Sequence, residues 1–232
     1  PGFGEPDSCY IFKTNVWLEK ERYQWTIPLK TIDSVAEIFY NFLDNKISGL
    51  PWCLENVQDE TIGIKSHLIQ LNKKYIFTIN SQPPLNSIKS NHPVHGWGSK
   101  GGYVYQKGYL ECFVPTKIVE TLKSIDGIYY YSQDNNGKII TTDKDITTIG
   151  LTWGVFENAE ILQPTIFNIN SFNIWRKEAF NFWKTRWQNY YTKDSESWQI
   201  IQEIIDNYSL LVIVDNNYLD FSFDRLMNVF PS

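Results

Sequence analysis

The sequence has few of the residues that usually carry covalent or metal chemistry. Its 232 residues include three Cys, three His and one Met. Cys9, Cys53 and Cys112 are odd in number and far apart, which favours buried thiols in a reducing compartment over a disulfide framework. His92 and His95 have no nearby Cys pair or third spaced ligand, so we interpret them as ordinary loop residues.

Long hydrophobic runs and an excess of positive charge are also missing. No run approaches the length of a transmembrane helix and the N-terminus lacks a signal-peptide pattern, which predicts a cytoplasmic protein with no membrane contact. The net charge is -5, with both signs interspersed, so the nucleic-acid-binding class is excluded. The chain opens at Pro1 rather than Met, which is consistent with a domain excised from a longer protein.

No catalytic constellation is present, so we assign no catalytic residue to this chain. The segment 96–101 matches the G-x-G-x-x-G pattern, but a dinucleotide site needs a strand before it and a helix after it. Here a Pro-containing polar loop precedes the glycines and the strand-like Tyr103-Val104-Tyr105 follows them. The glycines therefore predict a loop shaped for backbone turns and close packing.

Apolar residues are abundant, at 42% of the chain with nine Trp, which predicts a large core. Their spacing of three and four predicts several helices. The predicted helices cover 35–43, capped by Thr31 or by Ser34 with Glu37, then 60–71, 115–125, a Trp-rich stripe at 172–190, 198–208 and 221–230.

Short β-prone runs lie between these helices. They cover 75–78, 103–105 and 109–113 (as one strand bent at Gly108 or as two), 128–132 and 138–141 around a hairpin turn at 134–137, 149–155 and 210–214. Without a regular βαβ period, the order predicts an α+β fold with a mixed, largely antiparallel sheet core and peripheral helices. We expect a single domain at 31–232, with residues 1–30 packed on it as a linker-proximal segment.

The stretch Thr78-Ile79-Asn80-Ser81-Gln82 concentrates neutral polar side chains next to an apolar run. We expect the strand to end at about Thr78 and Pro83-Pro84 to stop any regular element. A strand end of this kind suits a small polar ligand, and it equally suits an ordinary capped strand end.

Further blocks in fixed order surround that stretch. They are Leu50-Pro51-Trp52, Asp59-Glu60-Thr61, His95-Gly96-Trp97-Gly98-Ser99-Lys100-Gly101-Gly102-Tyr103, Leu151-Thr152-Trp153-Gly154-Val155-Phe156 and Gln163-Pro164-Thr165. Together they resemble the C-terminal regulatory domain of eukaryotic methylenetetrahydrofolate reductase, from Phe3-Gly4-Glu5 to Val214-Asp215-Asn216. The resemblance implies an allosteric domain that binds S-adenosylmethionine or S-adenosylhomocysteine. It would control the reduction of 5,10-methylenetetrahydrofolate to 5-methyltetrahydrofolate in one-carbon and methionine metabolism.

The resemblance also implies the residues that contact the ligand. They are Gln58, Asp59, Glu60, Thr61, Thr78, Ile79, Asn80, Ser81, Gln82, Thr152 and Thr165. One carboxylate with several neutral hydroxyls and amides suits a ligand that carries a sulfonium, an ammonium, a carboxylate and ribose hydroxyls. On residue types alone, a solvated helix start explains Glu60-Thr61 equally well.

The expected partners follow from the same resemblance. They are the protein's own catalytic barrel, which would hold FAD and NADPH, and a second copy bound through this domain. Tyr10 is our predicted relay to the barrel, and the alternative is that it packs in the domain's own core. Two other functions remain open: a free-standing S-adenosylmethionine-dependent methyltransferase, and an interaction module with a vestigial pocket.

Overall fold

The computed structural model describes most of the chain beyond residue 27. The described residues are 28–47, 50, 57–141, 148–155, 165–168, 180–181, 183–185, 187–188, 191–219 and 221–231. The predicted relay residue Tyr10, nearly all of the segment 1–30, Cys9 and Cys53 lie outside them.

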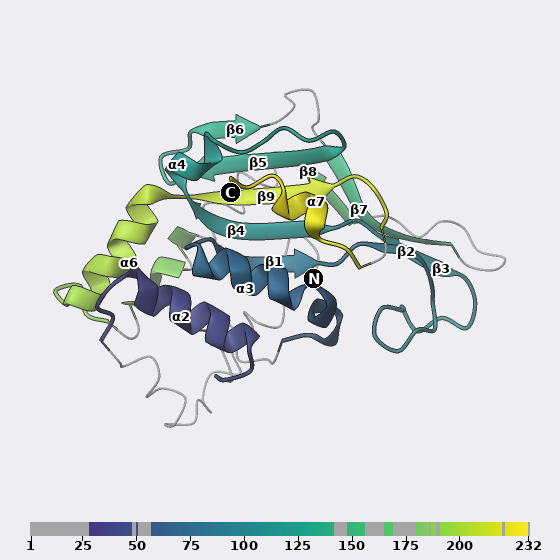
Figure 1. Cartoon of the computed structure of the whole chain (residues 1–232), viewed down its shortest axis with the longest axis horizontal. Helices are drawn as coiled ribbons and strands as arrows, with labels where there is room; N and C mark the ends of the chain where they lie inside the picture. The colour runs from purple at the N-terminus through teal and green to yellow at the C-terminus, as the bar shows by residue number, and fades with distance from the viewer. Residues whose placement is uncertain are drawn as a thin grey trace.

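Two antiparallel sheets form the frame of the described part (Figure 1). The five-stranded sheet has the order β1-β4-β9-β5-β6, with β1 at Phe77–Gln82, β4 at Tyr109–Pro115, β9 at Tyr208–Asp215, β5 at Ile128–Asp134 and β6 at Ile139–Thr141. The four-stranded sheet has the order β2-β3-β7-β8, with β2 at Leu85–Lys89, β3 at Tyr103–Gln106, β7 at Thr148–Val155 and β8 at Thr165–Asn168. The predicted α+β class is confirmed, and every strand pair that the structure describes is antiparallel.

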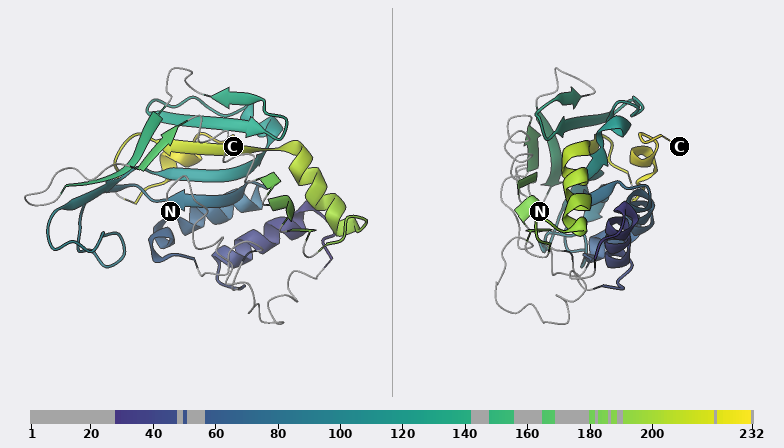
Figure 2. Two further views of the ribbon diagram at one scale, coloured as in Figure 1. Left: turned by 180° about the vertical axis from the view of Figure 1, so that it is seen from behind. Right: turned by 90° about the vertical axis from the view of Figure 1, so that its left-hand side faces the viewer.

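Helices cover the five-stranded sheet on both faces (Figure 2). They are α2 at Ile32–Leu43, the 3-10 helix η1 at Asp59–Ile64, α3 at Lys65–Lys73, α4 at Thr116–Val119, α6 at Glu196–Asn207 and α7 at Asp224–Met227. Apolar residues of α6 join the core on one face, and those of α3 and α7 join the core on the other. α2 packs along α3 and β1.

The alternation of side chains along β4 divides the core into these two clusters. Tyr109 and Phe113 join the cluster on the α6 face, whereas Leu110, Cys112 and Val114 join the cluster on the α3 face. Burial raises the pKa of the Cys112 thiol, which keeps it protonated and confirms the expected buried thiol at this position.

The Trp-rich stripe packs against the sheet where the structure describes it. Trp183 stacks on Phe113 with ring centroids 4.3 Å apart and also contacts Phe77 at 5.9 Å. Phe180, Trp183 and Trp187 are all buried. The prediction that this stripe is core is confirmed for these residues.

The predicted end of the first strand is wrong. Backbone pairing continues from Phe77↔Phe113 through a bulge at Thr78/Asn80 to Gln82↔Tyr109, because a strand pairs through backbone groups whatever its side chains are. Pro83 and Pro84 do stop the element as predicted, since β1 ends at Gln82 and a new strand, β2, starts at Leu85. They carry the chain from one sheet to the other.

Other boundaries also differ from the predictions. Thr31 is the N-cap of α2, but Ser34 lies inside the helix and its hydroxyl accepts from the backbone N–H of Lys30, so the capping box is wrong. The helices predicted at 115–125 and 221–230 shrink to the single turns α4 and α7. The two strands around Gly108 belong to different sheets, so they are not one bent strand.

Candidate functional site

The predicted ligand segment at residues 58–61 lies beside the predicted ligand strand. η1 contacts β1 and continues directly into α3. Thr61 is buried, whereas Gln58 and Asp59 are exposed. Burial raises the pKa of the Glu60 carboxyl, and a cation placed beside it would oppose that shift.

Thr78 is tied to α3 by one buried side chain, Asn72. The Asn72 amide donates from Nδ2 to the Thr78 hydroxyl at 2.8 Å and accepts at Oδ1 from the Thr78 backbone N–H at 3.2 Å. The same Nδ2 also donates to the carbonyl of Leu68 at 2.8 Å. Sequence reasoning missed Asn72, although an Asn shortly before a strand and next to Leu71 was a visible signal.

The bulge in β1 sorts the polar residues of that strand onto two faces. Thr78 pairs with Cys112 and Ser81 with Leu110, so both point to the α3 face of the sheet. Asn80 pairs with Glu111 and Gln82 with Tyr109, so both point to the α6 face. The stretch therefore does not form one contiguous row of ligand groups.

Glu111 is a second residue that the sequence analysis missed. Its side chain is 1% exposed, and one carboxylate oxygen accepts from the Tyr109 hydroxyl at 2.8 Å. The signal was a lone acidic residue within the strand Leu110-Glu111-Cys112-Phe113. A carboxylate this deeply buried costs several kcal/mol unless it is well paired, so it marks a polar region inside the α6 face beside Asn80.

Gln82 and Thr152 meet across the two sheets. The Gln82 side chain donates from Nε2 to the carbonyl of Lys107 at 2.8 Å and lies 3.5 Å from that of Leu151. The Thr152 hydroxyl is 3.3 Å from the Gln82 Oε1. Thr152 also pairs in register with Thr165 of β8, so the backbone brings three predicted residues together at this junction.

A hollow of about 290 Å³ lies between α2 and α3, away from these residues. It is lined by Tyr40, Asp44, Lys46, Ile69 and Lys73. The ammonium of Lys46, 2.9 Å away, lowers the pKa of the Asp44 carboxyl, so the charged groups there already pair with each other. No predicted ligand residue lines the hollow.

The glycine and histidine loop between β2 and β3 is built from turns. A Cβ at Gly96 would lie 2.2 Å from the carbonyl oxygen of Ser90, and Gly98 has a φ of +77°. The His92 Nδ1 accepts from the backbone N–H groups of Val94 and His95, which occupies one of its two possible ligating atoms. Within the described ranges no three His, Cys, Asp or Glu side chains gather as a metal site. The loop leads into β3 and not into a helix, as predicted.

The predicted ligand residues that the structure describes lie on η1, β1, β7 and β8 and at Gln58, the N-cap of η1. A family model described as "MTHFR, SAM-binding regulatory domain" matches residues 1–228. The chain belongs to this family.

Relatives from a yeast, a plant and a nematode agree with the family match. The chain is 41% identical over 227 residues to methylenetetrahydrofolate reductase 2 of Saccharomyces cerevisiae, covering 94% of this chain and 37% of that protein. It is 37% identical to methylenetetrahydrofolate reductase (NADH) 1 of Arabidopsis thaliana, covering 87% and 35%. It is 34% identical to a probable methylenetetrahydrofolate reductase (NADPH) of Caenorhabditis elegans, covering 94% and 36%. The chain thus spans little more than a third of the length of these relatives.

Proposed function

We propose that this chain binds S-adenosylmethionine or S-adenosylhomocysteine and thereby sets the activity of a methylenetetrahydrofolate reductase. The observation that carries the proposal is the family match across residues 1–228, in a chain that spans little more than a third of its relatives. The remaining length has room for a catalytic barrel that holds FAD and the reduced nicotinamide. We propose NADPH as the reduced nicotinamide. The names of the relatives include both NADH and NADPH.

The site chemistry supports this ligand class. Glu60 supplies a carboxyl that would gain from a cationic partner. Burial raises its pKa, and a cation beside it would offset that rise. Thr61 follows Glu60 in η1, Thr78 and Ser81 lie on β1, which η1 contacts, and Thr152 lies on β7 of the other sheet, and all four supply hydroxyls. We propose that the eleven residues expected from the sequence form the site as a group, including Thr165 beside Thr152.

Calorimetry with both ligands on the purified chain tests the proposal. A ligand at a hundredfold excess over its dissociation constant should stabilise the fold by about 2.7 kcal/mol, seen as a rise in the thermal midpoint. Failure to detect binding of either ligand at millimolar concentration would overturn it. Incubation with labelled S-adenosylmethionine and cell extract addresses the methyltransferase alternative, and we expect no transferred label.

Glu60→Gln sharpens the test because it removes charge with little change in shape. We expect it to weaken the binding of S-adenosylmethionine at least as much as the binding of S-adenosylhomocysteine. The expected loss is about 1.5–3 kcal/mol of binding free energy, the value for a hydrogen bond to a charged group. A larger loss for S-adenosylmethionine alone would place Glu60 beside the sulfonium. Unchanged affinity for both ligands would remove Glu60 from the site.

The outer face of the four-stranded sheet supports the proposed homodimer. Tyr103 is 44% exposed and Val155, its partner across the strands, is 36% exposed. Exposed apolar side chains that adjoin each other favour contact with another protein surface. Tyr103→Lys should lower the molar mass measured by light scattering if this face joins two copies. An unchanged mass would exclude it.

Tyr10 remains our proposed relay to the catalytic part of a cytoplasmic enzyme. In the full-length reductase, Tyr10→Ala should blunt inhibition by S-adenosylmethionine while ligand affinity stays nearly the same. Inhibition that survives unchanged would show that the relay does not run through Tyr10. No helix among the described residues is long and apolar enough to cross a membrane.

A further inference from the structure

Backbone groups fix the orientation of the buried Asn72 amide. Its Nδ2 lies 2.8 Å from the carbonyl oxygen of Leu68, which can only accept, and its Oδ1 lies 3.2 Å from the backbone nitrogen of Thr78, which can only donate. If the amide N and O were exchanged, Oδ1 would face the carbonyl oxygen of Leu68, which is an acceptor against an acceptor. Nδ2 would face the backbone N–H of Thr78, which is a donor against a donor. Asn72 is fully buried, so water cannot relieve such a mismatch.

The fixed amide decides what the Thr78 hydroxyl can do. The second N–H of Asn72 Nδ2 points at Thr78 Oγ1 at 2.8 Å, so that oxygen accepts. The hydroxyl proton of Thr78 is therefore directed to some other group. Thr78 is 8% exposed on the face of β1 that it shares with Ser81.

Gln82 fixes Thr152 in the opposite sense. Its Nε2 donates to the carbonyl of Lys107 at 2.8 Å, and the Leu151 carbonyl lies on the same side at 3.5 Å. Its Oε1 therefore faces the Thr152 hydroxyl, which must donate its proton across 3.3 Å. Only the lone pairs of Thr152 Oγ1 then remain for a further partner.

We propose that Asn72 and Gln82 are positioning residues that give two hydroxyls of the site opposite hydrogen-bonding polarity. Thr78 then donates to an acceptor on the ligand, and Thr152 accepts from a ligand N–H or O–H. Thr78 faces the α3 side and the Gln82–Thr152 pair the α6 side of β1, which is the edge strand of its sheet, so the ligand would have to pass that edge to reach both. Such a ligand presents an acceptor such as a carboxylate at Thr78 and a donor such as an ammonium or hydroxyl at Thr152. The inference rests on the proposed function, and it makes Gln82 a support of the site rather than a direct contact.

A double-mutant cycle at Asn72 and Thr78 tests the first half. The probe is S-adenosylhomocysteine, titrated by calorimetry into the chain at pH 8 and again at pH 9.5, because burial at position 72 raises the pKa of an introduced carboxyl. Asn72→Asp keeps the acceptor for the Thr78 N–H but presents a second acceptor to the hydroxyl, which must then turn its proton to the new carboxylate. We expect Asn72→Asp and Thr78→Val each to weaken binding by about three- to tenfold, the range of one neutral hydrogen bond.

The double variant separates positioning from general damage to the fold. If Asn72 acts only through the Thr78 hydroxyl, Asn72→Asp should add less than about twofold in the Thr78→Val background. Thr78→Ser, the matched control, keeps the hydroxyl and should bind within about threefold of the unsubstituted chain. Losses that multiply in the double variant would overturn the assignment, because a merely structural role of Asn72 would persist without the hydroxyl.

The second half has its own cycle, which also serves if Asn72→Asp does not fold. Gln82→Leu removes the acceptor of the Thr152 hydroxyl proton. The effect of this substitution on ligand affinity should disappear in the Thr152→Val background. Multiplicative losses there would overturn the role of Gln82. Thermal midpoints without ligand identify variants that are simply unfolded. Absence of binding to the unsubstituted chain would overturn the proposed function instead, so the two failures are distinguishable.

Discussion

The two sheets of this chain differ in how completely they are covered. All eight residues of β9, the central strand of the five-stranded sheet, are buried, with apolar clusters on both faces. In the four-stranded sheet, β2 and β3 extend away from this body (Figure 1), and β3 carries the exposed Tyr103. The comparison teaches that the first sheet supplies stability, whereas the second leaves surface for contacts beyond the domain.

Aromatic and polar contacts hold the second sheet to the end of the first. Tyr105 stacks on Trp153 with ring centroids 4.1 Å apart, and the indole N–H of Trp153 donates to the Tyr218 hydroxyl at 2.7 Å. The Lys107 ammonium lies 5.6 Å from the centre of the Tyr218 ring, and burial lowers its pKa. They add to the hydrogen bonds that Gln82 makes to Lys107 and Thr152 at the same junction.

The largest loss of folding stability is expected for a substitution in the core of the five-stranded sheet. Phe77 is fully buried and stacks on Tyr208 at 5.5 Å, with Phe39 at 5.0 Å. Phe77→Ala should lower the free energy of unfolding by about 3–5 kcal/mol, because it leaves a cavity. Urea unfolding followed by tryptophan fluorescence measures the loss, with the half-buried Trp153→Ala as the comparison. An equal or larger loss for Trp153→Ala would reverse the assignment of the two sheets.

The sequence predicted the five-stranded sheet well because its signals are local. The buried run 210–214 is apolar without interruption, and the turn Asp134–Gly137 has the residues of a tight hairpin, with Gly137 at a φ of +94°. β2 and β8 were missed because they are short and half polar, so pairing with their neighbours decides them.

The sequence predicted which segments contain the candidate site residues, but it did not predict which of these residues contact one another. The resemblance named β1 and β7, yet nothing local shows that Gln82 meets Thr152, which lies 70 residues away. The bulge that separates Thr78 and Ser81 from Asn80 and Gln82 comes from pairing with β4. Asn72 and Glu111 were missed because their roles depend on contacts across the fold.

The next effect concerns the link between β9 and α7. Arg225 donates from Nε to the buried Asp215 carboxylate at 2.7 Å and from Nη2 to the carbonyl of Asp126 at 2.6 Å. Arg225→Gln should lower the free energy of unfolding by about 2–3 kcal/mol, less than the loss of about 3–5 kcal/mol for losing one partner of a fully buried pair, because Arg225 is partly exposed. The exposed pair Lys138–Glu120 is the control, and Lys138→Gln should cost under about 1 kcal/mol. Similar costs in chemical denaturation would contradict the prediction.

A smaller effect is expected where the second sheet joins the first. Tyr218→Phe keeps the ring beside Tyr105 and Trp153 but removes the hydroxyl that accepts from the Trp153 indole. The loss in the free energy of unfolding should be about 1 kcal/mol. Near-ultraviolet circular dichroism should keep the Tyr105–Trp153 signal if the stack survives. Loss of that signal would show that the hydroxyl, rather than ring packing, holds the stack.

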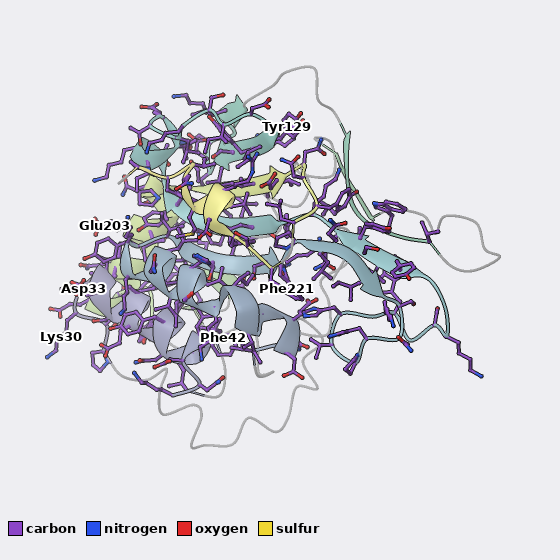
Figure 3. All side chains as sticks on the ribbon, turned by 45° about the vertical axis from the view of Figure 1, so that its right-hand side comes forward. Lys30, Asp33, Phe42, Tyr129, Glu203 and Phe221 are labelled. Carbon is purple, nitrogen blue, oxygen red and sulfur yellow. The ribbon has the colours of Figure 1, made fainter. Side chains whose placement is uncertain are left out.

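The smallest effect is a pH dependence confined to the β2–β3 loop. His95 lies against Phe221, labelled in Figure 3, with ring centroids 4.9 Å apart. Burial and then the neighbouring His92 lower the pKa of His95, so the unfolded chain binds the proton more tightly than the folded chain. The stabilising contribution is therefore constant above the unfolded pKa of about 6.5 and is lost as pH falls below it.

His95→Gln tests this by removing the titration at one position. Between about pH 7.5 and 5, the free energy of unfolding of the variant should fall less steeply than that of the unsubstituted chain, by under about 1 kcal/mol over the interval. At pH 8 His95 does not titrate, so the difference in the free energy of unfolding between the two chains there measures the cost of the lost packing. That difference is subtracted from the values at lower pH. The two rings of His92 and His95 stack at 5.1 Å, which places His92 where it lowers the pKa of His95. Parallel pH profiles for the two chains would show that the acid sensitivity of the fold arises elsewhere, and the β2–β3 loop would then be no more sensitive to acid than the rest of the domain.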